Sequence, residues 1–592
     1  MQLTNEQKQI VQSSGNIKIN SVAGSGKTTT VMEYAKAQNR RKRILYLAFN
    51  RSVKREAKEK FAAQGLHNVR VETAHSLAYR QTVRKYGYNV RSQSYKSFEM
   101  AKLLQLPNAG QKYGQYVLAN HVNKFMSYFC NSEVAKVQYL DYASTVHDKE
   151  AIDFVHQHYD LIERQTRLLL AKMNRGEIDI THDFYLKKYQ LDQPQLPYDY
   201  ILFDEGQDAS AAMLDVFLRQ KATKVIVGDT HQQIYTWRYA INSLQKVDFQ
   251  DYHLSTSFRF DQNIADLANQ VLDWKRALSN GKIQPISIKG IGQHQQSETK
   301  AILGRTNLGL LLKAIEYAVD KAEVNKIYFE GNFNSYAYAN EGASLYDVLN
   351  LYTGKRHLIR DELIKTMRDL EDLEDYITKT EDLQLMTMVE IVKEYGEDIP
   401  NILREIKDKH VTEEERHEAE MIFSTVHRSK GMEYDVVHLV NDFIPRKTLE
   451  EIAESRPKSI SAKLQEEINL LYVAITRTKH KLYIPDTLLP PDYLAAANIQ
   501  VLATKQEEEI DEPNQSASDS KDSDFEMTTT NLDERYAEIR KIHRAAYEPW
   551  TRELDLELTE MYIDGLSIKD LAQYFGRTKG AIRSRLEKLN IN

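Results

Sequence analysis

Short apolar runs alternate with helical patterns along the first 85 residues. This alternation is typical of β–α–β units and predicts a parallel sheet. It stops over residues 86–190, where long tyrosine-rich segments with few glycines predict helices, and it returns near residue 200. The predicted strands are IKINSV (17–22), ILYLAF (44–49), VRVETA (69–74), YILFDE (200–205) and KVIVGD (224–229). We therefore expect a first α/β domain at 1–85 and 191–249, interrupted by a helical insertion at 86–190.

A second α/β pattern begins at residue 250 and repeats this plan. Between its strands, residues 340–417 are rich in Glu, Lys and Leu and predict a short helical insertion. The predicted strands are AILGRT (301–306), KIYFEG (326–331), MIFSTV (421–426), VVHLV (436–440) and KLYIP (481–485). The second domain is therefore expected at 250–339 and 418–500, and the fold class is α/β.

The composition changes after residue 500. Residues 505–526 carry nine acidic and two basic side chains and few large apolar ones. Such a segment cannot bury enough apolar surface to fold, so 501–530 is predicted to be an acidic disordered linker. Residues 531–592 then predict a small all-α module, because apolar residues recur there at helical spacing and glycines separate the segments.

The remaining composition narrows the class of protein. The 592 residues include one cysteine, Cys130, which cannot form an internal disulfide or a thiolate zinc site. No segment approaches the ~18 apolar residues of a membrane span, and the polar N-terminus does not resemble a secretory signal. We expect a cytoplasmic protein without a membrane partner. The net charge of −6 gives no indication of nucleic acid, although an acidic protein can carry a basic groove.

A glycine-rich loop with a lysine follows the first predicted strand and precedes a helix. The segment AGSGKT (23–28) has the residue types of a phosphate-binding loop, in which Gly24, Ser25 and Gly26 turn backbone N–H groups toward phosphate oxygens. Lys27 would reach the β- and γ-phosphates. Thr28 would bind Mg²⁺, and Thr29 beside it is also predicted to bind the nucleotide. Ser21 replaces the usual first glycine, and the alternative is an ordinary glycine turn before a helix.

A second predicted strand ends in two acidic residues. In ILFDE (201–205), Asp204 can hold Mg²⁺ through water and Glu205 can act as the general base. Many strands end in acidic residues, so this segment taken alone could equally be an ordinary strand end without a catalytic role. Together with the upstream loop it predicts a site for ATP and Mg²⁺.

Ordered segments along the chain resemble the motifs of superfamily 1 DNA helicases of the UvrD/Rep type, and within them the F-box DNA helicase branch. Besides AGSGKT and ILFDEGQD, they are LTNEQKQIV (3–11), LAFNRSVKREAKEKF (47–61) with TAHSLAY (73–79), VGDTHQQIYTWRYA (227–240), STSFRF (255–260), STVHRSKGMEYDVV (424–437) and EEINLLYVAITRTK (466–479). The resemblance covers most of residues 1–490. It implies two RecA-like P-loop domains, each with a helical insertion, and an ATP-dependent motor that moves 3′-to-5′ on single-stranded DNA.

The resemblance also implies roles for individual residues at the nucleotide. Gln7 would read adenine, and Phe258 would stack on it where the family usually has tyrosine. Glu433 would accept from the ribose hydroxyl, and Gln232 would sense the γ-phosphate. Arg259 and Arg477 would stabilise the transition state when the two domains close. The alternative for each arginine taken alone is a solvated surface residue.

Five further residues lie in motifs that contact DNA in the family. Phe49, Tyr235 and Trp237 offer flat rings on which bases can stack, with core packing as the alternative. His75 and Arg238 are candidates for contacts to the DNA backbone. We expect single-stranded DNA and its junctions with duplex as partners.

The last 44 residues resemble a helix-turn-helix. Three short helices are predicted, and Lys579 and Arg583 lie one helical turn apart on the last of them. The module is predicted to bind duplex DNA, with docking of a protein as the alternative. For the whole chain, the alternatives are a motor that strips proteins from DNA with little unwinding, and an ATP-gated DNA-binding or defence-signalling module.

Overall fold

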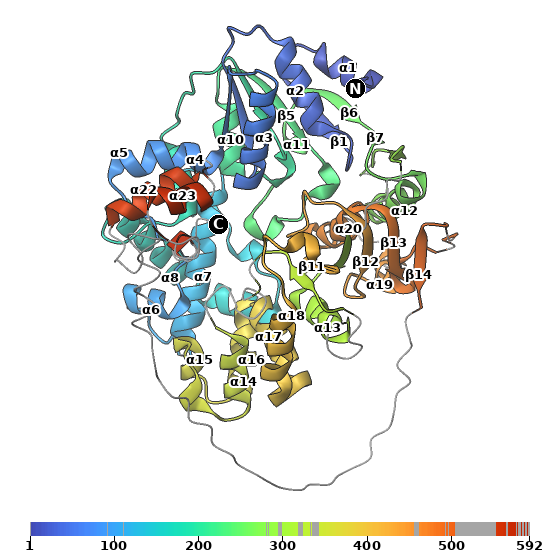
Figure 1. The fold of residues 1–592 in the computed structure, drawn as a ribbon. Coiled ribbons are helices and arrows are strands. Elements are labelled where there is room, and N and C mark those ends of the chain that lie inside the picture. The colour runs from blue at the N-terminus through green and yellow to red at the C-terminus, as the bar shows by residue number, and fades with distance from the viewer. Residues whose placement is uncertain are drawn as a thin grey trace. The chain divides into compact units, whose positions relative to one another are not determined.

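The computed structural model describes most of the first 503 residues and part of the C-terminal module (Figure 1). The described residues are 2–91, 93–110, 112–279, 281, 283, 285–293, 299–317, 324–331, 333, 343–454, 461–491, 493–494, 496–503, 552–563, 566, 568–575, 577, 582, 585–586 and 589. Contacts divide the chain into two compact units, one formed by 1–90 and 94–502 and the other by 91–93 and 503–592. Within the described residues, no helix is both long and apolar enough to span a bilayer.

The larger unit contains two parallel sheets, which confirms the α/β class. In its described residues, the first sheet has six strands in the order β3-β2-β4-β5-β1-β6. They are β1 (Ile17–Ser21), β2 (Ile44–Ala48), β3 (Val69–Thr73), β4 (Tyr200–Phe203), β5 (Thr223–Gly228) and β6 (Gln250–Leu254). The helices of this part are α1 (Asn5–Val11), α2 (Lys27–Ala37), α3 (Arg51–Ala63), α10 (Ala211–Leu218) and α11 (Ser243–Lys246). The five predicted strands are present. β2 and β4 are the apolar runs expected of parallel strands that are buried on both faces, whereas β1 and β3 also contain polar, half-buried residues.

The second sheet has six strands in the order β10-β11-β9-β12-β13-β14 in the described part of the chain. They are β9 (Lys300–Gly304), β10 (Ile327–Phe329), β11 (Met421–Thr425), β12 (Tyr434–Leu439), β13 (Thr478–Pro485) and β14 (Ile499–Leu502). Its helices are α12 (Gln262–Leu278), α13 (Asn307–Ile315), α19 (Arg446–Glu454) and α20 (Ala462–Ile475). The strands predicted for this half are also present.

Strand β6 corrects the predicted boundary at residue 250. It pairs in parallel with β1, from Ile17–Gln250 to Ser21–Leu254, and so extends the first sheet. Its burial pattern is exposed, exposed, half-buried, exposed and buried, as expected at a sheet edge. An edge strand without a continuous apolar run gives little sequence signal. The chain then forms a small parallel pair of β7 (Thr256–Ser257) and β8 (Lys289–Gly290).

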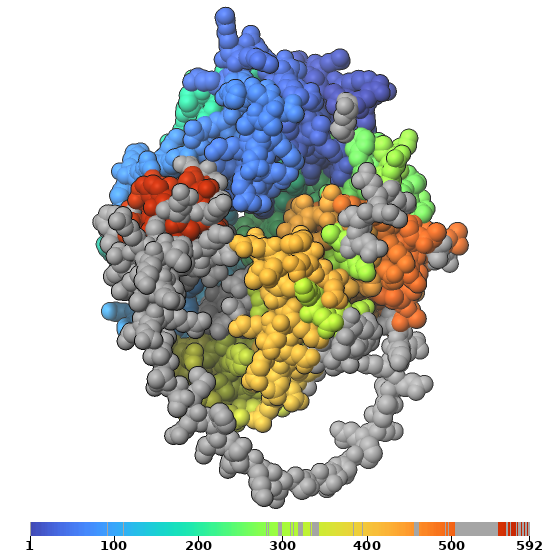
Figure 2. Space-filling model, in the orientation of Figure 1, coloured from blue at the N-terminus to red at the C-terminus, as the bar shows by residue number. Residues whose placement is uncertain are grey.

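Two groups of helices are inserted into these sheets. The first insertion lies between β3 and β4 and comprises α4 (Ala74–Ala78), α5 (Arg84–Tyr86), α6 (Ser97–Leu104), α7 (Gly114–Asn131), α8 (Lys149–Asn174) and α9 (His182–Leu191), with a π-helical turn at Tyr79–Val83. The second insertion lies between β10 and β11 and comprises α14 (Leu345–Tyr352), α15 (Glu362–Thr366), α16 (Leu370–Thr380), α17 (Leu383–Tyr395) and α18 (Ile399–Lys409), which form the yellow surface in Figure 2.

The two insertions contact each other directly. The Tyr113 hydroxyl on the first insertion donates to the Thr366 carbonyl of the second at 2.9 Å. Lys112 pairs with Asp372 at 2.7 Å, and Glu381 accepts from the backbone N–H of His147 at 2.8 Å. These polar contacts join helices that are more than 200 residues apart in the sequence.

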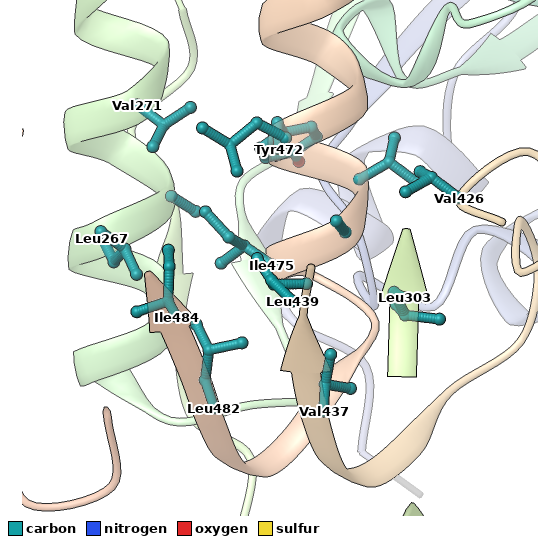
Figure 3. Packing of buried hydrophobic residues seen from close by; sticks show 14 of the residues in the cluster. Leu267, Val271, Leu303, Val426, Val437, Leu439, Tyr472, Ile475, Leu482 and Ile484 are labelled. Atoms are coloured by element: carbon teal, nitrogen blue, oxygen red, sulfur yellow. The ribbon is translucent and has the colours of Figure 1, made fainter. Parts of the chain in front are cut away.

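A continuous apolar core lies between the second sheet and two helices (Figure 3). Helix α12 contributes Leu267 and Val271, which are four residues apart and therefore lie on one helical face. Helix α20 contributes Tyr472 and Ile475, and the strands contribute residues such as Leu303. The same core includes Val22 and Ala23 of the phosphate loop and Ile234, so the loops of the first sheet pack directly against the second domain.

The smaller unit contains α22 (Arg552–Ile563) and α23 (Ile568–Tyr574) among its described residues. Leu558, Leu571, Phe575 and Ile582 are buried together, and Arg585 donates from Nε to Asp555 at 2.6 Å. Both helices lie within the segment predicted to form the all-α module. Lys579 and Arg583 lie outside the described residues, as does 504–530 of the predicted linker, so their predicted roles stay predictions.

Candidate nucleotide and nucleic-acid site

The phosphate loop has the backbone shape that anion binding requires. Gly24 and Gly26 have φ values of +73° and +76°, in the left-handed region that favours glycine. A Cβ at Gly24 would lie 2.6 Å from Ser257 Oγ. The hydroxyl of Ser25 is buried and lacks a hydrogen-bond partner among the described residues, and the N-terminus of α2 has no side-chain cap. Unpaired donors at a helix N-terminus fit a phosphate group.

The two acidic residues after β4 lie beside Lys27. Asp204 accepts from the Tyr46 hydroxyl and from the backbone N–H of Glu205. Glu205 has a φ of +53°, an uncommon conformation for a residue with a side chain. Its carboxylate lies 2.8 Å from Lys27 Nζ and also accepts from Gln207. Backbone strain of this kind persists where surrounding contacts hold it, and it is frequent at active sites.

Burial and charge separate the two carboxylates. Burial and the neighbouring Glu205 raise the pKa of Asp204. Burial alone would raise the pKa of Glu205, but the ammonium groups of Lys27 and Lys430 outweigh it and lower that pKa. Glu205 is therefore ionised at neutral pH, as a general base must be. A divalent cation near Asp204 and Thr28 would favour the ionised form of Asp204, so this donor set fits Mg²⁺.

Gln232 connects the first sheet with an arginine of the second domain. It lies in the segment 229–236 after β5, which we call the sensor segment. Gln232 Nε2 donates to Asp229 Oδ2 at 2.7 Å, and its Oε1 accepts from Arg477 Nη2 at 3.4 Å. Arg477 is fully buried and also donates to the carbonyls of Val473 and Met432, each at 3.2 Å. Burial and the nearby Arg259 lower the pKa of Arg477, so its charge is poorly compensated in this state.

Arg259 lies against the phosphate loop but contacts different groups. Its Nε lies 2.8 Å from Glu433 Oε2, and its Nη1 donates to the Thr476 carbonyl at 2.8 Å. The backbone N–H of Phe258 donates to the Gly24 carbonyl at 2.9 Å. Glu433, predicted to accept from a ribose, therefore holds Arg259 in this structure, and the ion pair would have to open for either predicted role.

Gln7 and Phe258 come together at Gly26. A Cβ on Gly26 would lie 3.2 Å from Gln7 Nε2 and 3.9 Å from the Phe258 ring. Gln7 is buried, and Thr30 Oγ1 accepts from its Nε2 at 3.1 Å while its Oε1 accepts from the Thr4 N–H. The two residues predicted to contact adenine thus lie on one side of the loop. Thr28 and Thr29 are half-buried in the first turn of α2.

The residues predicted to bind DNA form a second group next to the sensor segment. Phe49 and Tyr235 stack with ring centroids 5.5 Å apart, and both are half-buried. Trp237 is 55% exposed, and the guanidinium of Arg238 lies 4.6 Å from its ring centroid. The exposed Trp237 is not a core residue, whereas Tyr235 packs partly against the core. His75 is half-buried and faces Tyr185, and burial, with the nearby Arg238, lowers its pKa to about 4.

Sequence reasoning missed two residues that link these groups. Lys430 pairs with Asp208, lies 4.0 Å from Glu205 Oε2 and donates to the Gln232 carbonyl at 2.6 Å. The Tyr472 hydroxyl donates to Asp229 at 3.1 Å and accepts from the Ala23 N–H at 3.3 Å. Both residues lie within helicase-like motifs, and this is the only indication of their importance that the sequence offers. Their partners are more than 190 residues away, so no local pattern indicates the contacts.

Comparison with known families agrees with this site. The family described as the UvrD/REP helicase N-terminal domain matches residues 3–252, and the UvrD-like helicase C-terminal domain matches residues 344–487. The first match contains the phosphate loop, the two acidic residues and the sensor segment, and the second contains Lys430 and Arg477. The chain belongs to the UvrD-like helicase family.

Individual relatives narrow the resemblance. The chain is 29% identical over 514 residues to F-box DNA helicase 1 of Gallus gallus, covering 82% of this chain and 49% of the relative. It is 28% identical over 531 residues to F-box DNA helicase protein 1 of Schizosaccharomyces pombe, covering 82% and 58%. A probable DNA helicase II homolog of Mycoplasma pneumoniae is 25% identical over 340 residues, covering 49% and 44%. The chain thus spans about half the length of these relatives.

Proposed function

We propose that the chain is an ATP-dependent motor that moves on single-stranded DNA and separates the strands of duplex DNA. The main support for this proposal is the position of the sensor segment. At one end its Asp229 and Gln232 lie at the nucleotide site, and at the other end Tyr235, with Trp237 directly after the segment, lies among the residues proposed to bind DNA. Gln232 also contacts Arg477 of the second domain. One short segment can therefore connect nucleotide state, domain contact and DNA contact.

The chain's own residues would divide the hydrolytic work as follows. The loop N–H groups and Lys27 bind the phosphates of ATP, and Glu205 accepts the proton of the attacking water. Thr28 and Asp204 would hold Mg²⁺, which supplies charge neutralisation at the phosphates. Arg259 and Arg477 add positive charge in the transition state. For Lys27 to bind phosphate, its ion pair with Glu205 must open, and this also releases the base.

The choice of DNA and of 3′-to-5′ movement rests on resemblance. The names of the relatives from Gallus gallus and Schizosaccharomyces pombe support DNA as the substrate. Polarity is carried over from the helicases that the motifs resemble. We further propose that the C-terminal module binds duplex DNA or a protein partner.

The test is ATP hydrolysis by the full chain with and without single-stranded DNA, single-stranded RNA or duplex DNA. We expect strong stimulation by single-stranded DNA alone. Strand separation is then measured on duplexes with either a 3′ or a 5′ single-stranded tail, and only the 3′ tail is expected to support it. Stimulated hydrolysis without strand separation would indicate a motor that displaces proteins, and the absence of stimulation would contradict the motor.

A further inference from the structure

A buried lysine lies behind the sensor segment. Lys275, on α12, is 2% exposed, and its Nζ lies 2.6 Å from Asn469 Oδ1 and 3.2 Å from His231 Nδ1. Among the described residues it makes no ion pair with a carboxylate. A buried ammonium with only neutral partners is costly, and an apolar side chain would avoid that cost. The contacts of Lys275 therefore call for an explanation beyond packing.

The partners of Lys275 hold the sensor segment on both sides of Gln232. His231 precedes Gln232 and accepts from the lysine through its ring. Asn469, on α20, donates from Nδ2 to the carbonyl of Gln233 at 2.7 Å. The backbone around Gln232 is thus fixed by one hydrogen-bonded chain that runs from Gln233 through Asn469 and Lys275 to His231.

The protonation states of this chain of contacts are consistent. Burial and the positive charge of Lys275 lower the pKa of His231 well below its ordinary value, so the ring is neutral and can accept at Nδ1. Burial also lowers the pKa of Lys275, to about 7, against the opposing effect of Asp229. Asp229 accepts from the backbone N–H of His231 at 2.9 Å, which ties the histidine to the nucleotide site.

We propose that Lys275 is a positioning residue of the motor, which holds His231 and the adjoining backbone so that Gln232 bridges Asp229 and Arg477. This inference rests on the proposed function. Lys275 does not reach the nucleotide, and it acts through the sensor segment. Loss of its contacts should misplace Gln232 and Arg477 in the transition state while leaving the phosphate loop able to bind ATP.

The main test is Lys275→Met, which keeps the unbranched shape and removes the amine with its hydrogen bonds to His231 and Asn469. We expect kcat of DNA-stimulated ATP hydrolysis to fall about tenfold or more, with KM for ATP changed by less than about twofold. Lys275→Arg should restore part of kcat. In a Gln232→Ala background, Lys275→Met should have less than about a twofold further effect, because both changes remove the same arrangement. Asn469→Ala removes one link of the same chain of contacts and leaves Lys275 in place. It replaces Lys275→Met in this test if the methionine variant fails to fold.

A matched control is Lys187→Met on α9. Lys187 is also 2% exposed and also donates to neutral acceptors, including the Ser132 carbonyl at 2.9 Å, but it lies in the first insertion. This control can change thermal stability and should leave kcat unchanged. Wild-type kcat in Lys275→Met, an equal loss in Lys187→Met, or an additive effect with Gln232→Ala would each overturn the proposal.

A spectroscopic readout separates this inference from the motor function. Trp237 follows the sensor segment, and in a Trp274→Phe/Trp550→Phe background it is the only tryptophan. Lys275→Met should change its emission and its quenching by acrylamide without any nucleotide, whereas Lys187→Met should not. Unchanged Trp237 emission in Lys275→Met would overturn the positioning role even if the chain did not hydrolyse ATP. Absent hydrolysis with changed emission would instead contradict the motor alone.

Discussion

At the scale of residues, the site is held together by ion pairs that must open before the same side chains can bind a nucleotide. Lys27 pairs with Glu205, and Arg259 pairs with Glu433. The sequence singled out these residues, since each lies in a short motif, and the roles proposed for them stay predictions. It could not predict that they pair with one another, because the partners are more than 170 residues apart.

Glu205→Gln should separate nucleotide binding from turnover. The amide keeps the size of the side chain but cannot accept the proton of water, and a general base typically contributes about 10²–10⁴-fold to a rate. We expect ATP affinity within a few-fold of wild type, since the loop is unchanged, and hydrolysis reduced by that factor. The measurements are fluorescent-nucleotide binding and steady-state hydrolysis. Near-normal turnover would remove Glu205 from the role of base.

Arg259→Ala and Arg477→Ala should lower kcat by up to about 10³-fold with little change in KM. Their effects on stability should differ. Loss of Arg259 removes one ion pair to the half-exposed Glu433, which keeps Lys479 at 3.9 Å, and one hydrogen bond to a carbonyl, so the melting temperature should hardly change. Arg477 is fully buried and donates to two carbonyls and Gln232, so its loss should lower the melting temperature. A change in KM alone would make either residue a ground-state ligand.

At the scale of elements, strands with several apolar residues were predictable, including the edge strands β3 and β10, whereas the polar edge strand β6 was not. The apolar residues located β1 to β5, while β6 has four exposed or half-buried residues before its buried last position and was assigned to the second domain. The packing of the two insertions on each other had no local signal, because Tyr113 and Thr366 meet only in the folded chain. Pattern reasoning therefore gives elements and their order more readily than their contacts.

Glu72 on β3 should contribute a pH-dependent share of stability. Its buried carboxylate pairs with Lys54 at 3.0 Å and with Arg80, and these contacts outweigh burial and lower its pKa from 4.5 to about 2. A depressed pKa stabilises the fold above pH 4.5, and the contribution is lost as the pH falls toward 2. Glu72→Gln should therefore lower the free energy of unfolding by about 3 kcal/mol at pH 7, with a shrinking difference below pH 4.5.

The control is Glu56→Gln on α3, whose carboxylate is 62% exposed and pairs with Lys60. An exposed pair of this kind contributes up to about 0.5 kcal/mol, so the urea midpoint should hardly move at any pH. An equal loss in both variants, or a Glu72→Gln effect that does not depend on pH, would mean that the charge of Glu72 is not what stabilises this region.

Trp237→Ala should uncouple hydrolysis from strand separation. The exposed ring lies directly after the sensor segment, and stacking of a base on it is worth about 1–3 kcal/mol. We expect ATP hydrolysis to persist at saturating DNA while strand separation falls sharply and single-strand affinity weakens about tenfold. Tyr352→Ala, which removes a ring that is 48% exposed on the second insertion, is the control. Unchanged strand separation in Trp237→Ala would mean that the ring does not couple hydrolysis to strand separation.

At the scale of the whole molecule, the chain carries two units with separate cores. The larger unit contains the complete proposed motor, and its two domains share a core through Val22, Ala23 and Ile234. The smaller unit has its own buried cluster around Leu558 and Leu571. The acidic composition of 501–530 indicated this division from the sequence. A segment poor in apolar residues cannot pack into a core, so the parts before and after it are expected to have separate cores.

Deleting residues 531–592 should therefore leave single-strand-stimulated ATP hydrolysis intact and weaken binding to duplex or forked DNA. Two basic residues of this module are less able to contact DNA than the sequence suggests, because Arg577 is buried and Arg585 pairs with Asp555. If Lys579 and Arg583 supply two phosphate contacts, log K should fall with log salt at a slope of about −2. Duplex binding by the full chain, by Lys579→Glu/Arg583→Glu and by the 531–592 fragment over a salt series measures this. Fragment binding that is absent at low salt, or unchanged binding in the double variant, would make the module a protein-docking element.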